Sequence, residues 1–237
     1  MVAGNEAPTL HRFAGRCPPR GRIRLGAARR RITQITMLFT TDTTLIGRNV
    51  QLVPLTAIHH DDLVEAVRDG ELWKLWYTAI PTPEGMAAEI QRRQGLQKAG
   101  SMLPFAVLDP SGKAVGMTTY MNIDATNRRV EIGSTWYRKS VQRSALNSEA
   151  KRLLLAHAFE TLDCIAVEFR THWLNQQSRR GIERLGAKLD GVLRSHQINR
   201  HPDAQGALRD TCVYSIVASE WPSVKAHLDF QLSRPRT

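Results

Sequence analysis

The chain has 237 residues, three cysteines and a formal net charge of +11. This length is enough for one domain with a full apolar core, so folding needs neither disulfides nor a metal. The cysteines show no paired spacing, which favours a reduced, cytoplasmic protein. No apolar run reaches the length of a membrane-spanning helix, and the histidines lack metal-type spacing, so neither a membrane partner nor a metal is expected.

The positive charge is concentrated at the start of the chain. Residues 1–36 hold eight arginines and one acidic residue, Glu6, and therefore carry +7 of the total. Prolines, glycines and a lack of apolar periodicity indicate that residues 1–37 form a disordered basic extension. Two explanations for this extension are open. Either the start of the chain is misassigned upstream of Met37, or the extension is an arm that binds RNA or a membrane. Beyond this extension no nucleic-acid-binding motif is present, so a nucleic-acid partner is not expected there.

Apolar periodicity and turn residues divide the first half of the folded region into short elements. Residues 50–55 alternate as in a strand, and Pro54 places this strand at a sheet edge because proline cannot donate to a ladder. Helices are expected at residues 58–67 and 83–99. The buried side of the second helix is marked by Met86, Ile90 and Leu96.

An aromatic-rich stretch, residues 71–83, joins these two helices. Rings at this density usually contribute to a core, but a loop beside a scaffold also carries recognition. Trp73, Trp76 and Tyr77 are therefore either core residues or the wall of a substrate site.

Three strands are expected next, at residues 105–108, 114–121 and 130–137, and the turn residues between them predict an antiparallel meander. The third strand leads through a basic connector into an amphipathic helix at residues 145–160. A strand that runs into a helix N-terminus presents free backbone N–H groups and the positive end of the helix dipole. This junction is therefore a candidate seat for phosphate.

A strand at residues 165–171 follows this helix, and the strand–helix–strand order favours parallel pairing with residues 130–137. The remaining elements are a short helix at 175–185, a strand at 187–198 bent at Gly191, a strand at 211–217 and a terminal helix at 221–228.

The run Gln142-Arg143-Ser144-Ala145-Leu146-Asn147-Ser148-Glu149-Ala150-Lys151 resembles the Gcn5-related N-acetyltransferases (GNAT), together with Asn175-Gln176-Gln177-Ser178 and Leu185-Gly186-Ala187 downstream. It is most similar to the branch that acetylates the N-termini of ribosomal proteins (RimJ/RimL-type). The resemblance implies an α/β fold at residues 38–232, followed by a tail at 233–237. Its sheet is expected to be mixed, mostly antiparallel, of six to seven strands, flanked by helices, with two central parallel strands that splay apart.

The resemblance also implies acetyl-CoA as the cofactor. In the family a Gln/Arg-x-x-Gly-x-Gly/Ala loop holds the pyrophosphate through backbone amides, and here Ala145 and Asn147 stand at its two small positions. Backbone groups of the splayed strand are expected to meet the acyl carbonyl and the pantetheine. The implied cofactor-binding residues are Ile132, Gly133, Ser134, Thr135, Trp136, Gln142, Arg143, Ser144, Ala145, Leu146, Asn147, Asn175 and Arg179.

Acetyl transfer to an amine needs a group that takes the amine proton and a donor for the departing thiolate. The resemblance gives the donor role to Ser178, whose alternative is a helix cap. Glu131 is the candidate base, with solvent exposure or pairing with Arg129 as its alternative. Relatives in this branch place a second acid where this chain has Gln197, which cannot accept a proton, so neighbouring His196 is a further candidate base.

The predicted function is transfer of an acetyl group to a primary amine, either a protein N-terminus or a small amine. Trp73, Trp76, Tyr77 and Gln197 are the candidate substrate residues. The competing hypothesis is a non-catalytic acyl-CoA-binding or partner-binding protein on the same fold. A homodimer is the commonest assembly for such a protein.

Overall fold

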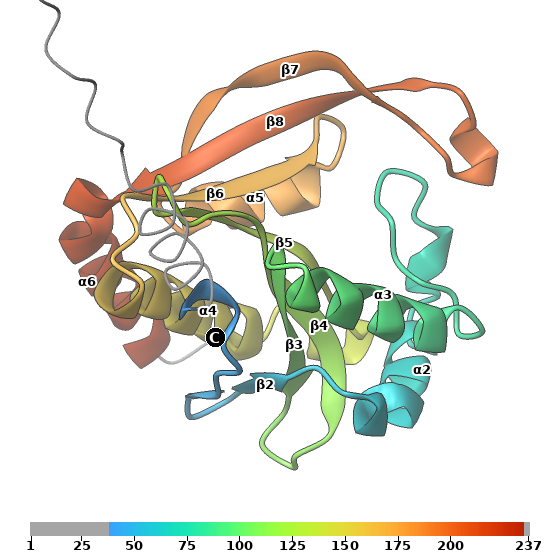
Figure 1. Cartoon of the computed structure of the whole chain (residues 1–237), viewed down its shortest axis with the longest axis horizontal. Helices are drawn as coiled ribbons and strands as arrows, with labels where there is room; N and C mark the ends of the chain where they lie inside the picture. The colour runs from blue at the N-terminus through green and yellow to red at the C-terminus, as the bar shows by residue number, and fades with distance from the viewer. Residues whose placement is uncertain (1–37, 235–237) are drawn as a thin grey trace, which may run out of the picture.

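The computed structural model of the chain describes residues 38–234; the basic extension predicted at residues 1–37 and the last part of the predicted tail lie outside the described residues. The described part is built on one eight-stranded mixed sheet with the strand order β1-β2-β3-β4-β5-β6-β8-β7 (Figure 1). All neighbouring strands are antiparallel except β5 and β6, which run parallel. The α/β class and the mostly antiparallel sheet expected from the sequence are confirmed.

The strands are β1 (Leu45–Ile46), β2 (Gln51–Pro54), β3 (Met102–Leu108), β4 (Ala114–Asp124), β5 (Arg129–Tyr137), β6 (Ala166–His172), β7 (Lys188–Ile198) and β8 (Leu208–Val217). The helices are α2 (His60–Arg68), α3 (Met86–Lys98), α4 (Ala145–Ala156), α5 (Gln176–Arg184) and α6 (Trp221–Ser233). Short helical turns precede α2, α4 and α6, and α4 runs on into a π-helical turn at His157–Thr161.

The sheet has eight strands where six to seven were expected, and several element bounds differ from the sequence prediction. The short strand β1 pairs with Gln51 and Leu52, so β2 is not the edge strand; a strand of two residues is too short to show periodicity. Pro54 lies beyond that pairing, where its missing N–H leaves no gap in the ladder with β1. The second helix begins at Met86, because the residues from Pro83 to Gly85 form a turn.

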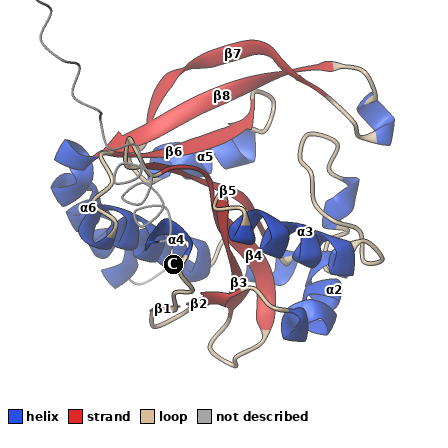
Figure 2. Cartoon of the chain, in the orientation of Figure 1, coloured by secondary structure: helices blue, strands red, loops and turns tan. Residues whose placement is uncertain are grey.

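Helices cover both faces of the sheet and enclose two separate apolar cores (Figure 2). Residues of α4, α5 and α6 pack on one face, which we call the α4 face. Residues of α2 and α3 pack with β3, β4 and β5 on the other face, which we call the α3 face. Met86 and Ile90 lie in this second core as predicted, but Leu96 is only half-buried, and the buried position nearest to it is held by Arg93.

Strands β7 and β8 form a long hairpin that arches over the α3 face (Figure 1). The register of this hairpin shifts between Leu189 and Gly191, which is the bend predicted at Gly191. At the far end of the hairpin, the Asn199 side chain donates a 3.1 Å hydrogen bond to the carbonyl oxygen of Trp76. The hairpin is thereby fastened to the aromatic stretch at residues 71–83. Among residues 38–234, no helix has the length and apolar character that a membrane crossing requires.

Candidate active site

The pairing between the two parallel strands ends early. β5 and β6 are in register only from Arg129 opposite Ala166 to Glu131 opposite Glu168, whereas β5 continues to Tyr137 paired with β4. The rest of the β5 edge therefore lacks β6 as a partner, and its backbone groups can bind another molecule. Helices α4 and α5 both begin beyond the carboxyl ends of these strands, the position at which α/β sheets bind ligands. The predicted splaying of the central strands is confirmed.

Arg93 fixes the unpaired part of β5 from the α3 face. Its side chain is only 1% exposed and binds Glu89 through Nε at 2.7 Å. Its Nη1 donates to the Thr119 hydroxyl at 2.6 Å, and its Nη2 donates to the Ser134 carbonyl at 3.2 Å. Ser134 has a left-handed backbone (φ 46°) in a stretch where the β4–β5 register shifts. Sequence reasoning missed Arg93, because arginine in a helix ordinarily faces solvent.

Lys151 supports the same stretch from the α4 face. The amine of this buried residue lies 2.8 Å from the Thr135 hydroxyl and 3.3 Å from the Thr118 hydroxyl, and these two hydroxyls are 2.7 Å apart. Burial lowers the pKa of Lys151 to about 7. The segment from Ile132 to Trp136 is thus held by a basic side chain on each face, while its edge toward β6 stays open.

The start of α4 has the features of an anion seat. Ser144 caps the helix: its hydroxyl accepts from the Leu146 amide at 3.2 Å and donates to the Val141 carbonyl at 2.7 Å. Arg143 adopts a left-handed backbone (φ 62°), and the first turn of α4 contains no acidic residue. These features fit a phosphate group, because helix N-terminal amides favour negative charge.

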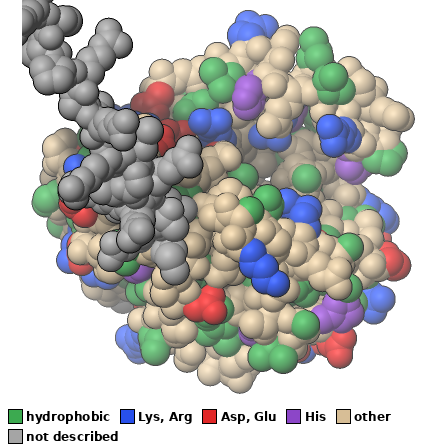
Figure 3. All heavy atoms as spheres, viewed as in Figure 1, with side chains coloured by type: hydrophobic (Ala, Val, Ile, Leu, Met, Phe, Trp, Pro, Cys, Tyr) green, Lys and Arg blue, Asp and Glu red, His purple; other side chains and the backbone are tan. Residues whose placement is uncertain are grey.

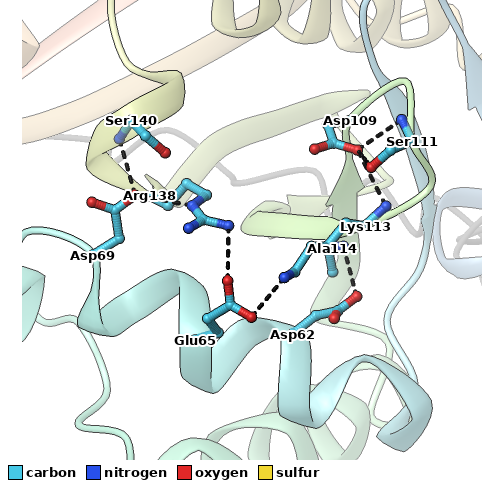
Figure 4. Close-up of polar contacts among 9 residues, drawn as sticks. All are labelled: Asp62, Glu65, Asp69, Asp109, Ser111, Lys113, Ala114, Arg138 and Ser140. Atoms are coloured by element: carbon cyan, nitrogen blue, oxygen red, sulfur yellow. Dashed lines mark hydrogen bonds and ion pairs between the residues drawn. The ribbon is translucent and has the colours of Figure 1, made fainter.

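The connector ahead of α4 is tied to α2 by a polar network (Figure 4). Arg138 pairs with Asp69 at 2.9 Å and with Glu65 at 3.4 Å, and the Ser140 amide donates to Asp69 at 3.1 Å. Hydrogen bonds from Ser140 and Arg138 lower the pKa of Asp69. The charge of Arg138 is therefore compensated, and its role is to position the loop. Gln142 has a similar role, since its side chain donates to the Tyr137 carbonyl at 2.9 Å.

At the start of α5, the predicted cap and donor have separate roles. The side chain of Asn175 caps the helix by accepting from the Ser178 amide at 3.0 Å. Within residues 38–234, the half-buried Ser178 hydroxyl makes no hydrogen bond, so the capping alternative for this side chain is wrong. Arg179 stacks on Trp173 at 4.2 Å and donates to the Tyr214 hydroxyl at 3.1 Å. This guanidinium is engaged inside the fold, and its contact with the cofactor stays a prediction.

Glu131 lies on the α3 face where the β5–β6 pairing ends. It is 5% exposed, and the Asn122 amide donates to it at 2.7 Å, while Arg170 lies 3.5 Å away. The alternative that it faces solvent or pairs with Arg129 is wrong, because Arg129 binds Glu168 at 2.6 Å. Burial raises the pKa of Glu131, which is a property of carboxylates that act as bases near neutral pH.

The other predicted acceptor residues are dispersed. Trp73 packs on the apolar core of the α3 face, as in the core alternative. Trp76 makes edge contacts with Tyr77 (5.7 Å) and with His172 at the end of β6 (5.2 Å), so these rings border the α3 face beside the splayed strands. The remaining two candidates, His196 and Gln197, are exposed on β7; the ring of His196 lies 3.1 Å from the Thr211 hydroxyl.

A parallel pair that separates ahead of two helix N-termini, with a buried carboxylate at the point of separation, is the arrangement expected of an acetyl-CoA-dependent acyltransferase. The chain belongs to the acetyltransferase (GNAT) domain family, which matches residues 49–188. This family uses acetyl-CoA, and the enzyme is an N-acetyltransferase.

Three relatives show how far the similarity extends. The chain is 31% identical over 114 residues, 48% of its length, to the protein named "Putative ribosomal N-acetyltransferase YdaF" of Bacillus subtilis (strain 168), and the match spans 59% of that protein. A GCN5-related N-acetyltransferase from Brucella melitensis has 31% identity and a TM-score of 0.70, covering 81% of this chain and 86% of that one. Mycobacterium smegmatis RimJ, solved with CoA-disulfide, has 22% identity and a TM-score of 0.66 (81% and 94% covered), which shows a shared fold.

Proposed function

We propose that this protein transfers the acetyl group of acetyl-CoA to a primary amine by direct attack, with CoA held along the β5 edge and at the start of α4. The observation that carries this proposal is the end of β5–β6 pairing at Glu131, directly ahead of both helix N-termini. Acetyl-CoA supplies an activated thioester, so a covalent enzyme intermediate is not required. The chain supplies a binding edge, a base and a donor.

Glu131 takes the proton of the attacking amine in this proposal. It is buried beside one amide donor, and its raised pKa makes it a stronger base than an exposed carboxylate. His196 and Gln197 lie on the exposed strand β7, which favours Glu131 over His196 for this role.

The Ser178 hydroxyl donates a hydrogen bond to the sulfur of the leaving thiolate and keeps its proton. Its hydroxyl sits in the first turn of α5 and is not used for capping, because Asn175 fills that position. A donor at a helix N-terminus also benefits from the positive end of the helix dipole, which stabilises the negative charge that develops on sulfur.

The cofactor part of the proposal assigns the pyrophosphate to the amides of Gln142 to Asn147 and the pantetheine to Ile132 to Trp136. The basic residue Arg143 and the absence of acids in the first turn of α4 support this assignment. The acceptor is a primary amine. The name of the Bacillus subtilis relative makes a protein N-terminus one candidate, and a small amine is the other.

Thiol release from acetyl-CoA, measured with the full chain and a panel of peptides and small amines, tests the proposal together with CoA affinity from calorimetry. Ala145→Asp should weaken CoA binding by about 10-fold or more, because it places a negative charge at the anion seat. Ala87→Asp, in the first turn of α3, is the matched control and should leave affinity unchanged. Tight CoA binding without turnover would instead support the non-catalytic alternative, and equal affinities in the two variants would contradict the anion seat.

A further inference from the structure

The α3 face beside Glu131 carries a layer of charges from β5 and β6. Arg129 pairs with Glu168 at 2.6 Å, and Arg170 pairs with Glu168 at 3.0 Å and with Glu131 at 3.5 Å. Two arginines and two glutamates compensate one another in this layer. It therefore offers no net charge to a ligand.

Arg209 of β8 adds one further positive charge to this layer. Its half-buried guanidinium interacts electrostatically with Glu131, and its charge also acts on His172. The Nε atom of Arg209 is shielded from solvent and has no hydrogen-bond partner in the described part of the chain. Leaving such a donor unpaired costs free energy that a ligand accepting the hydrogen bond would recover. The Nε atom of Arg170 also lacks a hydrogen bond in this part of the chain, but it lies 3.5 Å from the carboxylate of Glu131.

Strand alternation places Arg209 on the acceptor side and not on the cofactor side. The β8 residues Cys212, Tyr214 and Ile216 belong to the core of the α4 face, so Arg209 and Thr211 face the opposite way. Helix α4, whose N-terminus is the anion seat, packs on the α4 face. Arg209 therefore serves a ligand other than the CoA phosphates.

The space-filling view shows the surface hollowed between the β7–β8 hairpin and α3, with Lys and Arg side chains around the hollow (Figure 3). Strand alternation turns Arg209 toward this side of the sheet. Trp76 borders this region through His172, and Asn199 holds the hairpin end against it. Because the charge of Arg209 acts on Glu131, an acceptor bound at Glu131 also lies within reach of this charge.

The chemistry of Arg209 selects the ligand group. A guanidinium presents a planar fork of donors that matches the two oxygens of a carboxylate. The layer has a surplus of one positive charge, which one carboxylate neutralises, whereas a doubly charged phosphate would leave a net negative charge beside Glu131 and Glu168. In the proposed reaction Glu131 takes the proton of the attacking amine. The amine and the carboxylate that binds Arg209 are therefore close together and belong to the same molecule.

Resting on the proposed acetyl transfer, we propose that Arg209 determines acceptor specificity and that the acceptor is a primary amine with a carboxylate close to its amino group. A free amino acid and a peptide with an acidic residue beside its N-terminus both have this chemistry. The two sources are separated by offering each as a pair of substrates that differ only in charge.

The experiment compares an amino acid with its amide, and a peptide beginning Ser-Asp with one beginning Ser-Asn, in steady-state acetylation by the full chain. Arg209→Gln should raise the KM for the carboxylate member of the preferred pair by about 10- to 100-fold, the loss of a charged hydrogen bond, and change the neutral member less than about 2-fold. The KM of Arg209→Lys for the carboxylate member should lie between the values of the parent and of Arg209→Gln. The matched control is Arg194→Gln, which removes an 81% exposed arginine of β7 and should change neither KM.

Comparison within a pair removes any effect of Arg209 on the basicity of Glu131, since that effect is common to both members. Equal losses for the carboxylate and the neutral member, or a parent enzyme indifferent to the carboxylate in both pairs, would overturn the inference. Calorimetry of the same ligands on the CoA-loaded protein separates failure of the carboxylate site from failure of the proposed acetyl transfer. Binding that depends on Arg209 without turnover would uphold the carboxylate site and reject catalysis, whereas binding independent of Arg209 would reject the site.

Discussion

The guanidinium of Arg93 donates a 3.2 Å hydrogen bond to the backbone carbonyl of Ser134 and thereby connects α3 to the open edge of β5. A peptide unit is planar, so fixing the Ser134 carbonyl also fixes the direction of the Thr135 N–H. Glu89 and Thr119 hold the other guanidinium nitrogens, which leaves the side chain little freedom. A residue outside the family motif thus orients the backbone that is assigned to the cofactor.

Arg93→Lys tests this positioning role. The lysine keeps the charge but cannot reach Glu89, Thr119 and Ser134 with one fork, so we expect kcat/KM to fall by about 10-fold or more and the free energy of unfolding to fall by about 1–3 kcal/mol. Steady-state kinetics and urea denaturation measure the two effects. Arg92→Lys is the matched control, because Arg92 is exposed and binds the same carboxylate at 2.7 Å. Equal losses in both variants would reject a special role for Arg93.

Ser178→Ala should lower kcat by about 100-fold while the affinity for CoA changes little, since the hydroxyl acts on a charge that appears only during the reaction. Asn175→Ala should instead cost about 1 kcal/mol of stability through loss of the α5 cap. Single-turnover kinetics and calorimetry separate these effects. A parallel loss of CoA affinity in Ser178→Ala would assign the hydroxyl to binding.

The sequence predicted the fold because its signals were local. The β3–β4–β5 meander follows from turn residues, and the crossover from Tyr137 to Ala166 follows from the helical period between two apolar strands. Strand β1 was missed since two residues carry no period. Proline is common in the first turn of a helix, so the pattern predicts a start at Pro83, whereas Gly85 is the residue that precedes the helix.

The candidate site was less accessible to sequence reasoning, because its support comes from residues far apart in the chain. Glu131 and Ser178 were found through family motifs. Arg93 and Lys151 were not, since a basic residue in an amphipathic helix normally lies in solvent, and only tertiary packing shows that these two are buried. Arg209 was missed for a related reason. Its role depends on the pairing of β8 with β6 and of β6 with β5, which periodicity does not reveal.

Glu131→Gln tests the base through pH dependence. Burial raises the pKa of Glu131. The wild-type kcat/KM should therefore fall as the pH decreases and the carboxylate becomes protonated, and this fall should occur at a higher pH than an ordinary glutamate would give. Glutamine keeps the shape but accepts no proton, so the rate should drop by about 100-fold or more and lose this acid limb. An unchanged acid limb in Glu131→Gln would assign the titration to another group, and His196→Gln is the variant that would then remove it.

Lys151→Met tests the cost of burying an amine beneath β5. The folded protein holds the pKa of Lys151 at about 7 against an ordinary value of 10.5, so at pH values between these the unfolded chain binds a proton that the folded chain does not. The burial of Lys151 lowers the free energy of unfolding by its full amount below about pH 7. This loss of stability disappears as the pH rises through the pKa that Lys151 has in the unfolded chain. Methionine has similar length and no charge, and the hydroxyls of Thr118 and Thr135, which are 2.7 Å apart in the parent, bind each other without the amine.

The variant should therefore be more stable than the parent at pH 7, by about 5 kcal/mol at most, because the pKa values of 10.5 and about 7 differ by about 3.5 units and each unit corresponds to about 1.4 kcal/mol. This difference should shrink steadily as the pH is raised toward about 10. Urea denaturation of both proteins at several pH values measures it, and other titrating groups cancel because they are common to both. Lys225→Met is the control, since this lysine pairs with Glu160 near the surface at 2.8 Å. A stability difference that does not vary with pH would mean that Lys151 is charged in the folded protein.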